Sequence, residues 1–172
     1  NAYSVTLDIL GEHSTSKSDA LSITKEYTDL YKNIYDQKLD CNLSIKLTHI
    51  GLDICKNFTR NNLSALIKEA NKTHNFLRID MESSKITDST LKLYKECKEH
   101  YSEVGTVLQA YLYRSADDLK MLNSDNNFNF RLCKGIYKEN PNIAIQGRNE
   151  INNNFITLLK YAFENQIYVG IA

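Results

Sequence analysis

The sequence lacks an excess of charge of either sign, because Lys and Arg number 21 and Asp and Glu also number 21. Nucleic-acid-binding domains usually carry a basic excess or stripe, so no nucleic-acid partner is predicted. Long apolar runs are also missing, and no segment approaches the roughly 20 residues of a membrane span. Residues 1–4 lack the basic and apolar parts of a signal peptide. We expect one globular domain over residues 1–172.

Cysteine is scarce, and its spacing does not indicate a metal site. Cys41, Cys55, Cys97 and Cys133 form no CxxC pair, and the histidines are not clustered with them. Structural zinc sites need such clusters, so no metal is predicted. Disulfide frameworks belong to small secreted chains, so we expect reduced thiols in an intracellular protein.

The sequence does contain a regular alternation of short β-type runs and longer amphipathic segments. Its periodicity predicts strands at 3–9, 42–48, 76–81, 107–113, 128–134 and 167–171. It predicts helices at 18–39, about 63–70, 87–101, 116–122 and about 151–163. No Asn-Gly hairpin signal separates the strands. Parallel strands need crossover helices, so the chain is predicted to be an α/β protein with a parallel sheet.

Two architectures fit this alternation, a doubly wound open sheet and a (β/α)8 barrel. The residues Leu10-Gly11-Glu12-His13 after the first run do not match the GxGxxG turn of dinucleotide-binding sheets. Polar residues instead lie in or at the ends of several predicted strands, as barrel active sites require: Glu12, Lys46, Asp80, Glu82, Gln109, Arg131 and Lys134. A complete barrel takes roughly 250 residues and eight units. We therefore expect an incomplete (β/α)8 barrel of six strands and five helices.

The most distinctive segment runs from Phe130 to Tyr137. It is predicted to be a buried strand, yet it carries Arg131 and Lys134. Charges on an interior strand are costly unless a polar or anionic partner meets them. Gly135 allows close backbone approach, and Tyr137 offers a flat face for a ring. A structural arginine paired with a carboxylate is the alternative, but the combination favours an anion-binding or cofactor-binding site.

Lys46 lies on the same face of its predicted strand as Ser44. A lysine inside a barrel binds a substrate carboxylate or forms a Schiff base. The alternative is that the ammonium reaches solvent at the strand end. The pattern leaves both interpretations open.

Two further strands carry polar side chains. Asp80 and Glu82 share one face with Arg78, where they form a structural ion pair or orient a cation or hydroxyl near a reacting centre. Gln109 lies in an otherwise apolar run and needs partners. A flavin's pyrimidine edge or a polar side chain on a neighbouring strand would supply them.

Taken together, five segments resemble the proline dehydrogenase family, the flavin-dependent barrel enzymes that begin proline catabolism. The match is closest to the short, monofunctional bacterial type. The segments occur in family order and span nearly the whole chain: Thr6–Glu12, Leu43–Thr48, Leu77–Glu82, Leu108–Tyr111 and Arg131–Tyr137.

The resemblance implies roles in catalysis and substrate binding. Lys46 corresponds to a lysine that helps bind the proline carboxylate. Tyr137 corresponds to an aromatic residue that shapes the proline pocket. Asp80 corresponds to the active-site aspartate, and Arg131 to the arginine beside flavin N5, where hydride arrives.

The resemblance also implies a set of FAD-binding positions. Met81 matches a flavin-contacting position, and Gln109 matches the glutamine that hydrogen-bonds the isoalloxazine. Lys134, Gly135 and Ile136 match the segment that runs along the FAD. The family usually has alanine at the position of Ile136.

The expected reaction is oxidation of L-proline to 1-pyrroline-5-carboxylate, with FAD as hydride acceptor and a membrane quinone as final acceptor. This implies a cytoplasmic protein with peripheral membrane contact. The family's N-terminal helices, its later Thr-His element and its arginine pair are expected to lie outside residues 1–172. Two alternatives remain: a Schiff-base aldolase barrel that uses Lys46 or Lys134, and a catalytically incomplete fragment.

Overall fold

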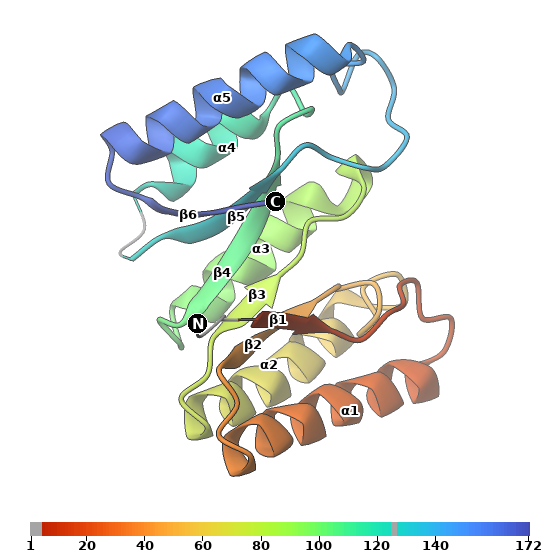
Figure 1. Cartoon of the computed structure of the whole chain (residues 1–172). Helices are drawn as coiled ribbons and strands as arrows, with labels where there is room; N and C mark the ends of the chain where they lie inside the picture. Colours follow the sequence, from red (N-terminus) through yellow and green to blue (C-terminus); the bar gives the residue numbers. More distant parts are fainter. Residues whose placement is uncertain (1–4, 125–126) are drawn as a thin grey trace. The chain divides into compact units, whose positions relative to one another are not determined.

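The computed structural model describes residues 5–124 and 127–172 (Figure 1). The chain divides into two compact units: residues up to 80 together with 92–104, and residues 81–91 together with 105–172. Across the described residues, six strands and five α-helices alternate, as the sequence predicts. Residues 3 and 4 of the first predicted strand lie outside the described residues. No helix in these described ranges has both the length and the hydropathy to cross a bilayer.

The first unit is built on three parallel strands in the order β1-β2-β3. Their bounds are β1 (Val5–Asp8), β2 (Cys41–Ile45) and β3 (Leu77–Ile79). The connecting helices are α1 (Lys17–Asp36) and α2 (Lys56–Lys72), which pack side by side (Figure 1). Leu7, Leu43 and Leu77 are opposite one another in the register. The two helices and the three strands therefore enclose one apolar core.

Helix α1 shows how local sequence sets an element's bounds. The Ser16 side chain caps its first turn by accepting from the backbone N–H of Asp19. The helix ends three residues before the predicted position 39. Lys38 adopts a left-handed φ of +53°, and the Leu39 N–H donates to the carbonyl of Ile34. This Schellman-type turn ends the helix and directs the chain into β2.

The second unit contains three parallel strands in the order β4-β5-β6. Its strands are β4 (Val104–Gln109), whose first residue belongs to the first unit, β5 (Asn129–Cys133) and β6 (Tyr168–Ile171). Its helices are α4 (Ser115–Leu122) and α5 (Arg148–Glu164). A 3-10 turn, η1 (Ser84–Ile86), leads into α3 (Thr87–Lys98), whose residues from 92 onward belong to the first unit. The core of the second unit contains the buried residues Phe130, Leu132, Leu119 and Leu158.

Five of the six predicted strands end earlier than expected: β1 at Asp8, β2 at Ile45, β3 at Ile79, β4 at Gln109 and β5 at Cys133. Lys46 and Asp80 therefore follow their strands rather than lie within them. The ends of β4 and β5 also change the course of the chain. The strand predicted at 107–113 begins at Val104 and ends at Gln109. Beyond it, Leu112 forms an isolated antiparallel bridge with Ala144. The chain therefore leaves β4 to pair with the loop before α5. The strand predicted at 128–134 ends at Cys133, so Lys134 is an exposed loop residue rather than a second cation inside a strand.

Candidate active site

The first unit gathers charged side chains at the carboxyl ends of its strands. Asp8 is the last residue of β1, Lys46 follows β2, and Asp80 follows β3. Nζ of Lys46 donates to Oδ2 of Asp8 at 2.7 Å, with the two side chains 21% and 27% exposed. Oδ1 of Asp80 accepts from the Ser44 hydroxyl at 2.6 Å. The structure therefore places both predicted residues, Lys46 and Asp80, in a partly buried polar cluster.

Tyr27 supports this cluster from α1. Its side chain is fully buried, and its hydroxyl donates to Oδ1 of Asp8 at 3.0 Å. Burial and the charge of Asp8 raise the pKa of Tyr27, so the hydroxyl remains a donor. Burial also lowers the pKa of the neighbouring His49, which packs edge-to-face on the Tyr27 ring. The cluster is thus bounded by a protonated tyrosine and a histidine whose neutral form is favoured.

The loop after β1 is fixed against the segment after β2. The Ser14 hydroxyl donates to the His49 carbonyl at 2.6 Å. Gly11 has a φ of +145°, and a Cβ there would lie 2.5 Å from Nε2 of His49. Nδ1 of His13 lies 2.6 Å from Oδ2 of Asp53. The close approach of His49 explains why glycine occupies position 11.

In the second unit, Gln109 is the last residue of β4 and is buried. Its Nε2 donates to the backbone carbonyl of Glu82 at 2.8 Å. The sequence predicts that Gln109 bonds to a side chain on a neighbouring strand or to a cofactor. In the structure its partner is a main-chain carbonyl instead. The Ser115 hydroxyl donates to the Gln109 carbonyl at 2.5 Å, and Met81 beside Glu82 is only 7% exposed. The Gln109 amide is therefore held in one orientation.

Arg131 is half-buried in the middle of β5, in register with Val107 on β4 and Gly170 on β6. Gly170 lies beside Arg131, and a Cβ at this glycine would make an ordinary contact of 3.7 Å with Cβ of Arg131. Of the predicted residues in the second unit, Gln109 and Arg131 lie on adjacent parallel strands.

The residues after β5 form an exposed turn. Gly135 has a φ of +107°, and a Cβ there would collide with the Tyr111 ring. Lys134 is exposed, Tyr137 is half-buried, and Ile136 is 88% exposed.

Glu139 fixes the far end of this turn. The sequence alone did not identify this residue. Its carboxylate accepts from the backbone N–H and from the hydroxyl of Ser84, at 2.7 and 2.6 Å. Ser84 lies three residues after Met81. The turn at 134–137 and the segment that carries Met81 are thus joined within the second unit.

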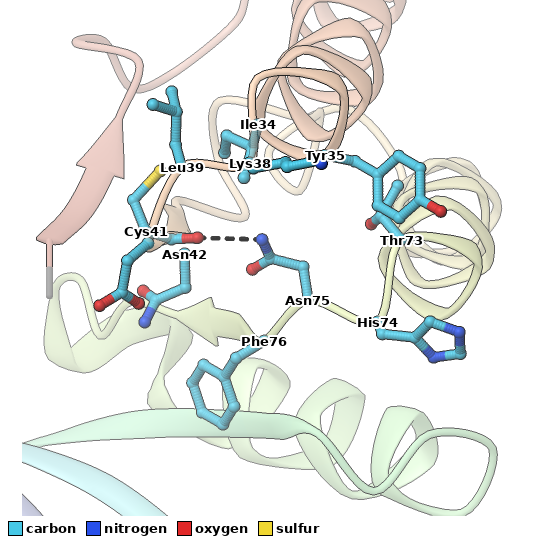
Figure 2. Close-up of a pocket in the computed structure, with 11 residues that line it drawn as sticks. Ile34, Tyr35, Lys38, Leu39, Cys41, Asn42, Thr73, His74, Asn75 and Phe76 are labelled. Atoms are coloured by element: carbon cyan, nitrogen blue, oxygen red, sulfur yellow. Dashed lines mark hydrogen bonds between the residues drawn. The ribbon is translucent and has the colours of Figure 1, made fainter.

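Two hollows of the described residues lie away from the predicted site residues. One of about 520 Å³ lies at the amino ends of β2 and β3, where the Asn75 side chain donates to the Cys41 carbonyl (Figure 2). Another of about 260 Å³ lies between α2 and α3, beside the Arg60–Glu96 ion pair. Barrel active sites form at the carboxyl ends of strands. Neither hollow contains a predicted site residue.

Comparison with known proteins identifies one family. A family model described as proline dehydrogenase matches residues 1–150. Proline dehydrogenase 1 of Bacillus subtilis subsp. natto is 35% identical over 167 residues, covering 97% of this chain and 55% of that protein. Proline dehydrogenase 2 of Bacillus subtilis strain 168 is 36% identical over 169 residues, covering 98% and 55%. The chain thus spans about half the length of the curated relatives it matches.

Solved structures confirm the predicted fold class. The crystal structure of proline utilization A from Bdellovibrio bacteriovorus, inactivated by N-propargylglycine, superposes with a TM-score of 0.85 at 22% identity, covering 98% of this chain and 22% of that one. Proline utilization A from Corynebacterium freiburgense gives 0.80 at 23% identity, covering 98% and 21%. The parallel strands and their helices therefore form an incomplete (β/α)8 barrel.

Proposed function

The chain belongs to the proline dehydrogenase family, and we propose that the whole protein oxidises L-proline to 1-pyrroline-5-carboxylate. The observation that carries the proposal is the family match over residues 1–150, which contains every candidate site residue described above. The chain spans about 55% of its curated relatives, so the reaction is proposed for the whole protein.

For the substrate, we assign Lys46 to the proline carboxylate and Tyr137 to one wall of the pocket. The ion pair with Asp8 supports this role, because it shows that the Lys46 ammonium contacts a carboxylate at this position. The half-buried ring of Tyr137 supports an apolar contact with the methylene groups of proline.

For the cofactor, we propose FAD, held by residues of the second unit. The Gln109 amide, held by the Glu82 carbonyl, suits the hydrogen-bonding edge of a flavin ring. The exposed Lys134 suits the anionic pyrophosphate, and Gly135 permits a close backbone approach. The buried Met81 and the exposed Ile136 supply apolar surface. A bound flavin supplies the acceptor for the hydride from the ring carbon beside the proline nitrogen.

We assign catalytic roles to Arg131 and Asp80. The guanidinium of Arg131 is always charged and would stabilise negative charge that develops near it. The Asp80 carboxylate, oriented by the Ser44 hydroxyl, would fix a cationic or hydroxyl group of the reacting complex.

We further propose that the electrons pass to a membrane quinone. This assignment places the protein in the cytoplasm, with peripheral contact at the inner membrane face. The family resemblance supports this proposal, and reduction of a quinone by the purified protein with proline would test it.

The Schiff-base alternative requires a neutral lysine amine that attacks a carbonyl. The Asp8 carboxylate 2.7 Å from Lys46 suits the ammonium form instead, and Lys134 lies in an exposed turn. A second alternative is that the 172 residues alone are a catalytically incomplete fragment. Turnover of proline by this chain with an artificial acceptor would refute that interpretation.

Purified whole protein separates the two chemistries. A flavin enzyme is yellow and loses its visible absorbance when proline is added without oxygen. An aldolase is colourless and becomes covalently trapped on its substrate by borohydride. A yellow protein that proline bleaches supports the proposal, and a colourless protein trapped by borohydride refutes it.

A further inference from the structure

The carboxylate of Asp8 divides its two oxygens between two donors. Oδ2 accepts from Nζ of Lys46 at 2.7 Å, and Oδ1 accepts from the hydroxyl of Tyr27 at 3.0 Å. Hydrogen bonds to an ionised carboxylate are stronger than those between neutral groups. An ammonium has three N–H donors, and one of those of Lys46 is directed at Asp8.

The Tyr27 end of this chain of contacts is rigid. The side chain is fully buried on α1, and its ring packs edge-to-face on His49 at a centroid distance of 6.4 Å. The hydroxyl also lies 3.4 Å from the Ile9 carbonyl. The direction of the hydroxyl, and therefore the orientation of Asp8, is set by the packing of α1 on the strands.

The charges around Asp8 favour a single cationic partner. His49 also lies near Asp8, and burial lowers the pKa of His49 despite the opposing charge of Asp8. A neutral imidazole does not compete with an ammonium for a carboxylate. The charge of Asp8 is therefore directed to Lys46.

We propose that Asp8 and Tyr27 are positioning residues, which fix the Lys46 ammonium before the substrate carboxylate arrives. This inference rests on the proposed function, in which Lys46 binds that carboxylate. A lysine side chain has four rotatable bonds, and restricting them in advance raises affinity for the ligand. Tyr27 acts through Asp8, so its effect depends on the presence of Lys46.

A double-mutant cycle in the whole enzyme tests this dependence. Tyr27→Phe is expected to raise KM for proline about three- to tenfold, with kcat changed less than about twofold. It is expected to weaken binding of cyclopentanecarboxylate, read from the flavin spectrum, by the same factor. In the Lys46→Met background, Tyr27→Phe is expected to change KM for proline and the dissociation constant of cyclopentanecarboxylate by less than about 1.5-fold.

Tyr31→Phe is the matched control. Tyr31 is also fully buried on α1, and its hydroxyl donates to the Phe76 carbonyl at 3.3 Å, before β3 begins. The control is expected to leave KM and carboxylate binding unchanged. Because Tyr31 has the same burial and loses the same group, it separates a general loss of packing from a loss of positioning.

Equal losses from Tyr27→Phe with and without Lys46, or no loss in either background, would overturn the proposal. If Tyr27→Phe does not fold, Asp8→Asn replaces it and is expected to weaken binding. Tighter binding by Asp8→Asn would show that Asp8 competes with the substrate instead. A wild-type protein that binds cyclopentanecarboxylate but is not reduced by proline refutes the proposed function and leaves the cycle readable. A wild-type protein that binds no ring carboxylate overturns both.

Discussion

Glu139 receives two hydrogen bonds from Ser84, one from the backbone N–H at 2.7 Å and one from the hydroxyl at 2.6 Å. The pair joins the turn after β5 to the segment after β3, two parts of the second unit that are 55 residues apart. Both parts carry proposed FAD-binding residues. The carboxylate therefore fixes the spacing of two walls of the proposed cofactor site.

Glu139→Ala should remove the hydrogen bonds that connect these two segments. A partly buried N–H that loses its acceptor costs about 1–3 kcal/mol, so the free energy of unfolding should fall by about 1–2 kcal/mol. Retention of flavin during dialysis of the whole protein should fall as well. Glu164→Ala, at an exposed position on α5, is the control and should change neither. Normal flavin retention by Glu139→Ala would show that the join does not shape the site.

Arg131→Met should slow the reduction of flavin by proline at least tenfold, because it removes a fixed positive charge from the position that we propose to lie beside the flavin. Stopped-flow absorbance measures this rate. Circular dichroism and thermal unfolding should show that the fold is retained. Arg148→Met, at the exposed start of α5, is the matched control. Unchanged reduction kinetics would remove Arg131 from its assigned role.

Gly135→Ala should destabilise the protein by about 1–3 kcal/mol, the usual cost of a strained backbone conformation. The added Cβ meets the Tyr111 ring, and the φ of +107° disfavours any L side chain. Gly170→Ala is the control, because a Cβ there makes ordinary contacts at 3.7 Å. Urea unfolding of the two variants should separate them clearly. Equal stabilities would mean that the turn relaxes without strain.

The ends of α1 and α2 carry an ordinary residue where glycine is favoured, as does the end of α5 at Gln166. Lys38 after α1 and His74 after α2 have φ values of +53° and +52°. Replacing either by glycine removes left-handed strain, and the net gain in unfolding free energy should be about 0.5–1 kcal/mol. Gln37→Gly is the control, because Gln37 has a φ of −88° and should lose stability. Destabilised Lys38→Gly and His74→Gly variants would contradict this interpretation.

The thiols should differ strongly in reactivity. Cys55 is exposed at the start of α2, where backbone N–H groups of Phe58 and Asn57 lower its pKa. Burial raises the pKa of Cys97 to about 12. The thiolate is the reactive form, so iodoacetamide should modify Cys55 first, with a pH midpoint below the ordinary thiol value. Cys97 should react only after unfolding. Mass spectrometry of labelled peptides decides this, and early labelling of Cys97 would contradict it.

The alternation of apolar runs was sufficient to predict the order and type of the elements, because each helix and strand buries one periodic face. It also predicted that polar residues gather at strand ends, as Lys46, Asp80 and Gln109 do. Strand ends were less accurate. β4 stops at Gln109 because the next residues pair with the loop before α5, which local sequence does not reveal.

The supporting residues of the site could not be predicted from the sequence. Tyr27 lies in the periodic apolar stripe of its helix, yet its hydroxyl supports Asp8 from 19 positions away. Glu139 and Ser84 meet across 55 positions. Such contacts depend on how elements pack, and nothing in the spacing of the residues distinguishes them. The one useful indication is general: a buried tyrosine needs a hydrogen-bond partner for its hydroxyl, and Tyr27 is such a residue.

Anaerobic titration of the purified whole protein with L-proline examines the proposed chemistry itself. The visible flavin absorbance should fall in proportion to added proline, and 1-pyrroline-5-carboxylate should appear in equal amount. A protein that contains no flavin, or whose flavin absorbance stays constant at saturating proline, would refute the assignment of this chain to proline oxidation.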